Sequence, residues 1–125
     1  MTIGKKSWAI AEGYLPPAGP NAGDRTLRSH ETASILNAND RDTEVRITIF
    51  FSDREPAGPY RVQVGARRTL HLRFDDLREP EPVPRGVDYA SLIESDLPVV
   101  VQHTRLDARE QGFKLMSTLA YAGAD

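Results

Sequence analysis

Polar side chains with directional hydrogen bonding follow a run of three valines near the end of the chain, in the stretch PVVVQHTRLD at 98–107. Gln102 supplies a carboxamide, His103 an imidazole and Arg105 a planar guanidinium fork. Groups of these types recognise carboxylates or sugar hydroxyls when they lie side by side. On an extended strand, Val101, His103 and Arg105 share one face, which therefore changes from apolar to polar. The pattern predicts a strand whose far end lines a ligand site.

The same stretch also fits a purely structural interpretation. Arg105 and Asp107 would then pair with each other or with neighbouring charges at the strand end, and His103 would bond to a backbone carbonyl. Structural ion-pair networks collect residues of these types as readily as binding sites do. The sequence alone leaves both interpretations open.

Two further sets of polar residues are second choices for a ligand site. His30 and Glu31 follow a Gly-rich loop, where a solvated strand start is the alternative. Trp8 and Glu12 share one face of the stretch SWAIAEGY at 7–14. An aromatic ring beside a carboxylate can stack on a sugar ring and bind its hydroxyls. The alternative for Trp8, the only tryptophan of the chain, is a place in the core.

Motifs of enzymes and metal sites are missing from the sequence. It contains no Gly-rich phosphate loop, nucleophile elbow, HExxH helix or paired-carboxylate motif. The histidines are His30, His71 and His103, and their separation matches no recognised metal site. We therefore expect a protein that is not an enzyme, with no metal and no cofactor.

A basic segment between residues 67 and 78 raises the question of nucleic-acid binding. Repeated on an oligomer, its arginines would face a phosphate backbone, but acidic residues nearby offer them partners within the chain. The formal net charge of the whole chain is -2, which provides no long-range attraction for DNA. DNA binding is therefore the weakest of the functional hypotheses. The arginines are Arg67, Arg68, Arg73 and Arg78, and the acids are Asp75, Asp76 and Glu79.

Length and composition indicate one domain, residues 1–125, with a single core. The absence of cysteine removes disulfides and thiolate sites and agrees with a reducing compartment. The first residues, MTIGKKSWAIAEGYLPP, lack the apolar segment of a signal peptide, and no stretch approaches the about 20 apolar residues that cross a bilayer. We expect a cytoplasmic protein.

Period-2 hydrophobicity predicts about eight β-strands. In the clearest, EVRITIFFS at 44–52, Val45, Ile47 and Ile49 share one face. Short strands between loops rich in Gly and Pro predict an all-β fold, a single-domain antiparallel β-sandwich with little helix. The stretch GARR predicts a hairpin between 60–64 and 69–74, SDLP predicts a turn at 95–98, and only 90–95 and 109–116 have a helical alternative. The other expected strands are 7–14, 31–38, 89–95, 98–107 and 115–122.

Longer stretches of the sequence resemble the sensory rhodopsin transducer family over nearly the whole chain and in the same order. They are SWAIAEGYLPP, SHETASILNA, ITIFFSDREPAGPYRVQVGARRTLHLRFDDL, DYASLIESDLPVVVQHTRLD and STLAYA. The resemblance implies a β-sandwich that assembles as a homotetramer. The namesake of the family associates with a membrane rhodopsin, and DNA binding has also been suggested for that protein. Many relatives are thought to bind sugars or related metabolites without any rhodopsin.

Residues and resemblance together predict a non-catalytic module for small-molecule binding and signalling, with a sugar or related metabolite as ligand. The alternative is a soluble transducer that relays a signal from a membrane photoreceptor by protein–protein contact. The predicted partners are further copies of the chain, a small polar ligand and, in the alternative, a membrane rhodopsin. The candidate ligand-binding residues are Arg105, His103 and Gln102, followed by Glu12, His30, Glu31 and Trp8.

Overall fold

The computed structural model describes residues 2–124, which form an all-β fold with one short 3-10 helix. Buried and exposed side chains alternate along the strands, and Val45, Ile47 and Ile49 are fully buried as their spacing predicts. The predicted antiparallel sandwich with little helix is confirmed. Its eight strands are β1 (Lys5–Tyr14), β2 (His30–Asn37), β3 (Thr43–Phe51), β4 (Ala57–Val64), β5 (Arg68–Arg73), β6 (Asp88–Asp107), β7 (Lys114–Leu119) and β8 (Tyr121–Ala122), and the helix is η1 (Phe74–Asp76).

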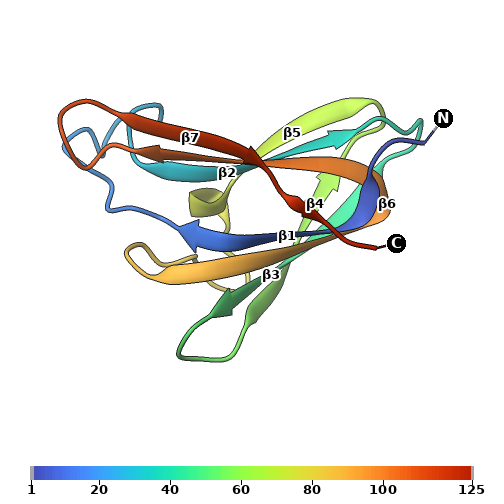
Figure 1. The fold of residues 1–125 in the computed structure, drawn as a ribbon, viewed down its shortest axis with the longest axis horizontal. Coiled ribbons are helices and arrows are strands. Elements are labelled where there is room, and N and C mark those ends of the chain that lie inside the picture. Colours follow the sequence, from blue (N-terminus) through green and yellow to red (C-terminus); the bar gives the residue numbers. More distant parts are fainter. Residues whose placement is uncertain (1, 125) are drawn as a thin grey trace.

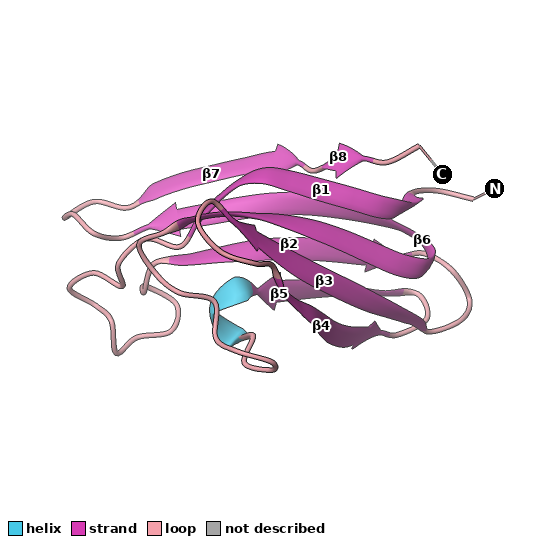
Figure 2. Ribbon diagram, turned by 90° about the horizontal axis from the view of Figure 1, so that it is seen from below, coloured by secondary structure: helices cyan, strands magenta, loops and turns pink. Residues whose placement is uncertain are grey.

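The long strand β6 belongs to both layers of the sandwich. Its first half pairs with β1 and β3, and its second half pairs with β2 and β7, always antiparallel. β4 and β8 extend the first layer beyond β3 and β1, and β5 extends the second layer beyond β2. In Figure 1, β6 runs to the right beside β1, bends, and returns to the left beside β2. Figure 2 shows the same layers from below, with η1 close to β5.

The bend of β6 falls at residues 95–98, where the sequence predicted a turn between two strands. The strand instead continues through this segment. Lys5 of β1 pairs with Val99 and Ser7 pairs with Glu94, so β6 uses more residues than β1 over the same length. Such an irregularity bends a strand sharply. The bend turns one strand into a member of two facing layers.

Side chains from distant segments satisfy the backbone groups at this bend. The N–H of Leu97 donates to Oγ1 of Thr43 over 3.0 Å, and Nδ2 of Asn39 donates to the carbonyl of Pro98 over 2.8 Å. The indole N–H of Trp8 donates to the carbonyl of Val99 over 2.9 Å. These bonds compensate for ladder bonds that the bulge interrupts, since unpaired buried backbone groups are costly.

The predicted hairpin between 60–64 and 69–74 is wrong. β4 pairs with β3 and β5 pairs with β2, so the turn between them carries the chain from one layer to the other. Arg67 in this turn has a φ of 56°, in the left-handed region that tight reversals use. The helical alternatives are also wrong, because 90–95 lies within β6 and 109–116 forms a loop and the start of β7.

Candidate functional site

A buried carboxylate, that of Glu31, lies at the centre of a polar cluster between the two layers. The Glu31 side chain is fully buried, and each of its oxygens accepts two hydrogen bonds. Oε1 accepts from the backbone N–H of Tyr14 over 3.0 Å and from the hydroxyl of Tyr89. Oε2 accepts from Nε2 of His103 over 2.9 Å and from Nε of Arg105 over 2.8 Å. We call Glu31, Tyr89, His103 and Arg105 the Glu31 cluster.

Alternation along two neighbouring strands brings the cluster together. On β2, Glu31 and Ala33 share the inward face, and on β6 His103 and Arg105 continue the inward face of the valines. The register of these strands places Ala33 opposite His103 and Glu31 opposite Arg105. Val101 is fully buried and His103 is 3% exposed. On this face the polar residues after the valines therefore line the interior of the sandwich, whereas Gln102 on the other face is exposed.

The hydrogen bonds of the cluster set its charge state. Burial raises the pKa of Glu31, but hydrogen bonds from His103, Tyr89 and Arg105 outweigh burial, so this pKa lies below its ordinary value of 4.5. Burial, together with the negative charge of Glu31, raises the pKa of Tyr89 well above its ordinary value of 10.0. At neutral pH the carboxylate is ionised and the phenol is neutral. The guanidinium of Arg105 balances the buried negative charge.

A pocket of about 320 Å³ opens beside the Glu31 cluster. It lies between residues 9–12 of β1 and a wall formed by Met116, Thr118 and residues 119–121, with His103 also in its lining. Most of the lining is apolar, and His103 and Glu12 are its ionisable groups apart from the Tyr121 phenol. An apolar cavity with a few fixed polar groups is the usual form of a small-molecule site.

The structure brings only some of the predicted ligand residues to this pocket. Glu12 and His103 line it, and Glu31 lies directly behind His103. Arg105 is not in the lining: its Nε is bonded to Glu31, and its Nη1 lies 3.7 Å from an oxygen of Glu12. Of the structural interpretation, the pairing with neighbouring charges is confirmed, because Arg105 binds Glu31 and Asp107 binds Arg109 rather than each other. The expected bond from His103 to a backbone carbonyl is wrong, because His103 binds the Glu31 carboxylate.

Three predicted residues lie away from the pocket. Gln102 is exposed on the opposite face of β6, and His30 turns its Nδ1 toward the carbonyl of Arg28 over 2.8 Å. Trp8 is 5% exposed, and its indole N–H binds the carbonyls of Lys5 and Val99. The expectation of a Trp8 platform for a sugar ring is therefore corrected: Trp8 belongs to the core, where its N–H closes the bend of β6.

Sequence reasoning missed Tyr89, the residue that joins the first layer to the cluster. Its ring is 5% exposed and lies 5.6 Å, between centroids, from that of Phe74. The inward periodicity of β6 contains a signal for it, because Tyr89 precedes Ser91 and Ile93 on the same buried face. A buried Tyr generally requires a partner for its hydroxyl, and that partner is Glu31.

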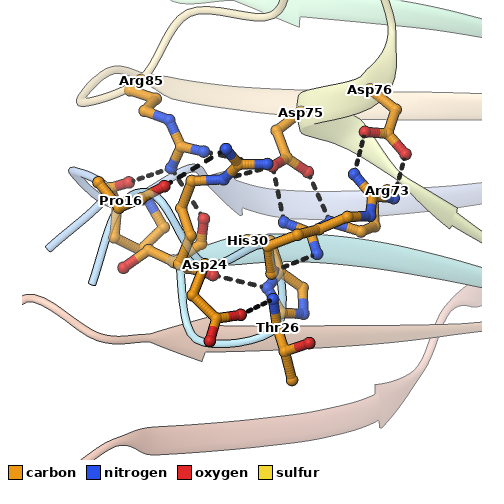
Figure 3. Close-up of polar contacts among 12 residues, drawn as sticks. Pro16, Asp24, Thr26, His30, Arg73, Asp75, Asp76 and Arg85 are labelled. Carbon is orange, nitrogen blue, oxygen red and sulfur yellow. Dashed lines mark hydrogen bonds and ion pairs between the residues drawn. The ribbon is translucent and has the colours of Figure 1, made fainter.

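A second polar cluster, shown in Figure 3, surrounds the carboxylate of Asp75. Arg73 donates to it from Nε over 3.0 Å and from Nη2 over 2.8 Å, and Arg85 donates from Nη2 over 3.3 Å. Nε of Arg28 lies 3.6 Å from the same carboxylate. Burial raises the pKa of Asp75, but Arg73 and Arg85 lower it more, so it lies below its ordinary value. Arg73 is thus a buried structural residue, which supports the pairing alternative for this part of the basic segment.

The Asp75 cluster anchors the long loop between β1 and β2. Nη1 of Arg85 donates to the carbonyls of Pro16 and Ser29, both over 2.8 Å, and Nη1 of Arg73 donates to the carbonyl of Arg25 over 2.7 Å. Ser29 in turn accepts a bond from the N–H of Ala108, just after β6. These bonds hold the ends of β2 and β6 together where Glu31 and Arg105 meet.

Neither a metal site nor a membrane-spanning helix is seen in the part of the chain that the structure describes. Residues 2–124 contain no group of three or more His, Asp or Glu side chains placed to hold a metal ion. Within the same residues, no helix is long and apolar enough to span a membrane.

Comparisons with known proteins agree with the resemblance seen in the sequence. The model of the family described as Anabaena sensory rhodopsin transducer matches residues 3–122. Among solved structures, the Anabaena sensory rhodopsin transducer is 52% identical with a TM-score of 0.71, covering 82% of this chain and 98% of its own. The crystal structure of Thermotoga maritima 1070 is 33% identical with a TM-score of 0.84, covering 96% of each chain. Curated protein sequences yield no match. The chain therefore belongs to the Anabaena sensory rhodopsin transducer family.

Proposed function

We propose that this protein is a non-catalytic binding module that takes a small polar metabolite, a sugar or a related compound, in the pocket beside the Glu31 cluster. The observation that carries the proposal is the placement of His103. Its imidazole is almost completely buried, is held by a fully buried carboxylate, and still lines the pocket. A polar group fixed in this way can orient a ligand without losing side-chain entropy on binding.

The geometry favours binding over catalysis. The Glu31 carboxylate accepts four hydrogen bonds, so it has no lone pair left over to serve as a base toward a substrate. Glu12 is the other carboxylate at the pocket, and its side chain is 86% exposed. A carboxylate so open to water lacks the enclosed setting that is usual for a catalytic acid or base. The assignment of the protein as a non-enzyme rests on this combination.

Thermal unfolding of the protein in the presence of neutral sugars, amino sugars and sugar acids tests the proposal. A ligand at 100 times its dissociation constant stabilises the native state by about 2.7 kcal/mol, which raises the melting temperature by several degrees in a domain of this size. His103→Gln should lose that rise relative to its own ligand-free melting temperature. His71→Gln, at an exposed position outside the pocket lining, is the matched control and should keep it. A ligand-induced rise in melting temperature that His103→Gln retains would contradict the assignment of the ligand site to this pocket.

Assembly into a homotetramer is also part of the proposal. Every residue of β7 is exposed, and Leu115 and Leu119 are 71% and 61% exposed. Along its described residues, β7 pairs with β6 on one edge only. An apolar edge strand of this kind is normally covered in a soluble protein. Light scattering should give a tetramer mass, and Leu115→Lys, outside the pocket lining, should lower it. A monomer mass for the wild type would contradict assembly.

A soluble transducer in the cytoplasm that contacts a membrane rhodopsin is the second candidate function. Its support is the 52% identity to a protein that carries this name. Co-purification of a retinal protein with the tagged chain in detergent would favour it, and the absence of any such protein together with a clear sugar response would contradict it. DNA binding stays the weakest candidate, because Arg73 is buried against Asp75.

A further inference from the structure

The polar groups at the pocket share one property, which is that they accept hydrogen bonds. They are the Glu12 carboxylate, the His103 imidazole and the hydroxyls of Thr118 and Tyr121, and neither Arg nor Lys is in the lining. His103 and Thr118 are register partners on β6 and β7, so their side chains lie next to each other on the same face. Whether each of these groups donates or accepts a hydrogen bond determines which hydrogen-bonding groups a ligand must supply.

The tautomer of His103 follows from its contact with Glu31. Oε2 of Glu31 also accepts from the Arg105 guanidinium, and a carboxylate with these donors carries no proton to give. The proton in the bond between Nε2 and Oε2 therefore belongs to the imidazole, and a neutral ring then has a lone pair on Nδ1. Within residues 2–124, Nδ1 has no hydrogen-bonded partner, and the ring, although only 3% exposed, is part of the pocket lining. The free acceptor of His103 is thus offered to the pocket.

Thr118 and Glu12 present acceptors as well. The Thr118 hydroxyl donates to the carbonyl of Leu119 over 3.3 Å, which leaves its oxygen lone pairs for a ligand. The Glu12 carboxylate is mostly exposed, and its one ion pair, to Arg105, spans 3.7 Å. Arg105 is not in the lining: its Nε is bonded to Glu31, its Nη2 is buried, and its Nη1 faces the Glu12 carboxylate over 3.7 Å. The charges of Glu31 and Arg105 cancel, so Glu12 leaves the site with one net negative charge.

We infer that the pocket selects ligands that bring hydrogen-bond donors and no negative charge, such as neutral sugars and amino sugars, and that it rejects sugar acids and sugar phosphates. The inference rests on the proposed function, since it specifies which ligands that pocket accepts. It also replaces the sequence-based expectation of an arginine fork that recognises a carboxylate. A carboxylate ligand would face the like charge of Glu12, with no Arg or Lys in the lining to compensate its desolvation.

Nitrogen-15 NMR of the ligand-free protein tests the tautomer directly. Long-range correlations of the imidazole should place the proton of the neutral His103 ring on Nε2 and leave Nδ1 unprotonated. Glu31→Gln should weaken this preference, because a carboxamide can either donate or accept toward Nε2. A proton on Nδ1 in the wild type would overturn the inference whether or not any ligand binds.

A panel of matched ligands tests the selectivity by calorimetry. Glucose, glucosamine and glucuronate, with the corresponding galactose and mannose compounds, differ within each series by one substituent. The acid should bind about tenfold or more weakly than its neutral and amino counterparts, the cost of about one unsatisfied hydrogen-bonding group. Glu12→Gln should reduce that ratio, and Glu55→Gln, an exposed acid outside the pocket lining, should leave it unchanged.

The outcomes separate this inference from the proposed function. Acids that bind as tightly as neutral sugars, or more tightly, would overturn the selectivity while leaving the binding module intact. If no compound of any charge type binds, the proposed function fails and the selectivity fails with it.

Discussion

Glu31 and Arg105 lie opposite each other on β2 and β6, and Nε of Arg105 donates to Oε2 of Glu31 over 2.8 Å. Glu31 is fully buried and the Arg105 side chain is 17% exposed, so this ion pair lies inside the sandwich. Burying two charges is costly, and the pair is favourable only because further hydrogen bonds satisfy the carboxylate. The same bonds orient His103 toward the pocket. The stability of the fold and the proposed ligand site thus both depend on the Glu31 carboxylate.

Arg105→Ala should therefore destabilise the protein strongly. It leaves a buried carboxylate without its compensating charge, and loss of one partner from such a pair costs about 3 kcal/mol or more. Urea unfolding measures the effect. Arg61→Ala, which removes an exposed pair with Glu44, is the matched control and should cost less than about 1 kcal/mol. Equal losses in the two variants would contradict the buried pair.

Stability should fall at both ends of the pH range. The pKa of Glu31 is lowered on folding, so its contribution is complete above the ordinary value of 4.5 and is lost as pH falls through the folded value. The pKa of Tyr89 is raised on folding, so the unfolded chain ionises first above about 10 and stability then declines. Chemical unfolding across pH tests this. Tyr89→Phe should weaken the alkaline decline, and an unchanged decline would assign it to another group.

Asp75→Asn should loosen the loop between β1 and β2. It removes the charge that Arg73, Arg85 and Arg28 surround, and it leaves these guanidiniums close together without compensation. Breaking a largely buried pair of this kind costs about 3 kcal/mol. Limited proteolysis under native conditions should then cut within residues 20–28. Asp53→Asn, at an exposed pair with Arg54, is the control and should leave the digestion pattern unchanged.

Thr43→Val should destabilise the bend of β6 without changing side-chain volume greatly. Oγ1 of Thr43 accepts from the N–H of Leu97 and is hydrogen-bonded to Oγ of Ser95. The valine would leave these polar groups unpaired, at a cost of about 1–3 kcal/mol. Thr48→Val, on the same strand, serves as the control. Equal unfolding free energies for wild type and Thr43→Val would show that water replaces the hydroxyl.

The inward and outward faces of the strands could be predicted from the sequence alone. Val45, Ile47 and Ile49 are buried as their spacing requires, and His103 and Arg105 continue the inward face of Val101. This succeeds because side-chain alternation is a local property of an extended chain. Pairing partners are not local, which is why the hairpin predicted around GARR is wrong although both of its strands exist.

Tertiary structure alone decided what the polar residues do. Glu31 and His103 are 72 residues apart, and only the register of β2 on β6 makes them a hydrogen-bonded pair. Asp96 and Pro98 favour a turn locally, yet distant side chains, among them that of Asn39, hold the strand continuous there. Trp8 is of a residue type that can stack on a sugar ring, but it is buried in the core. Residue type sets which bonds a side chain can form, and the packing of remote segments determines which of those bonds exist.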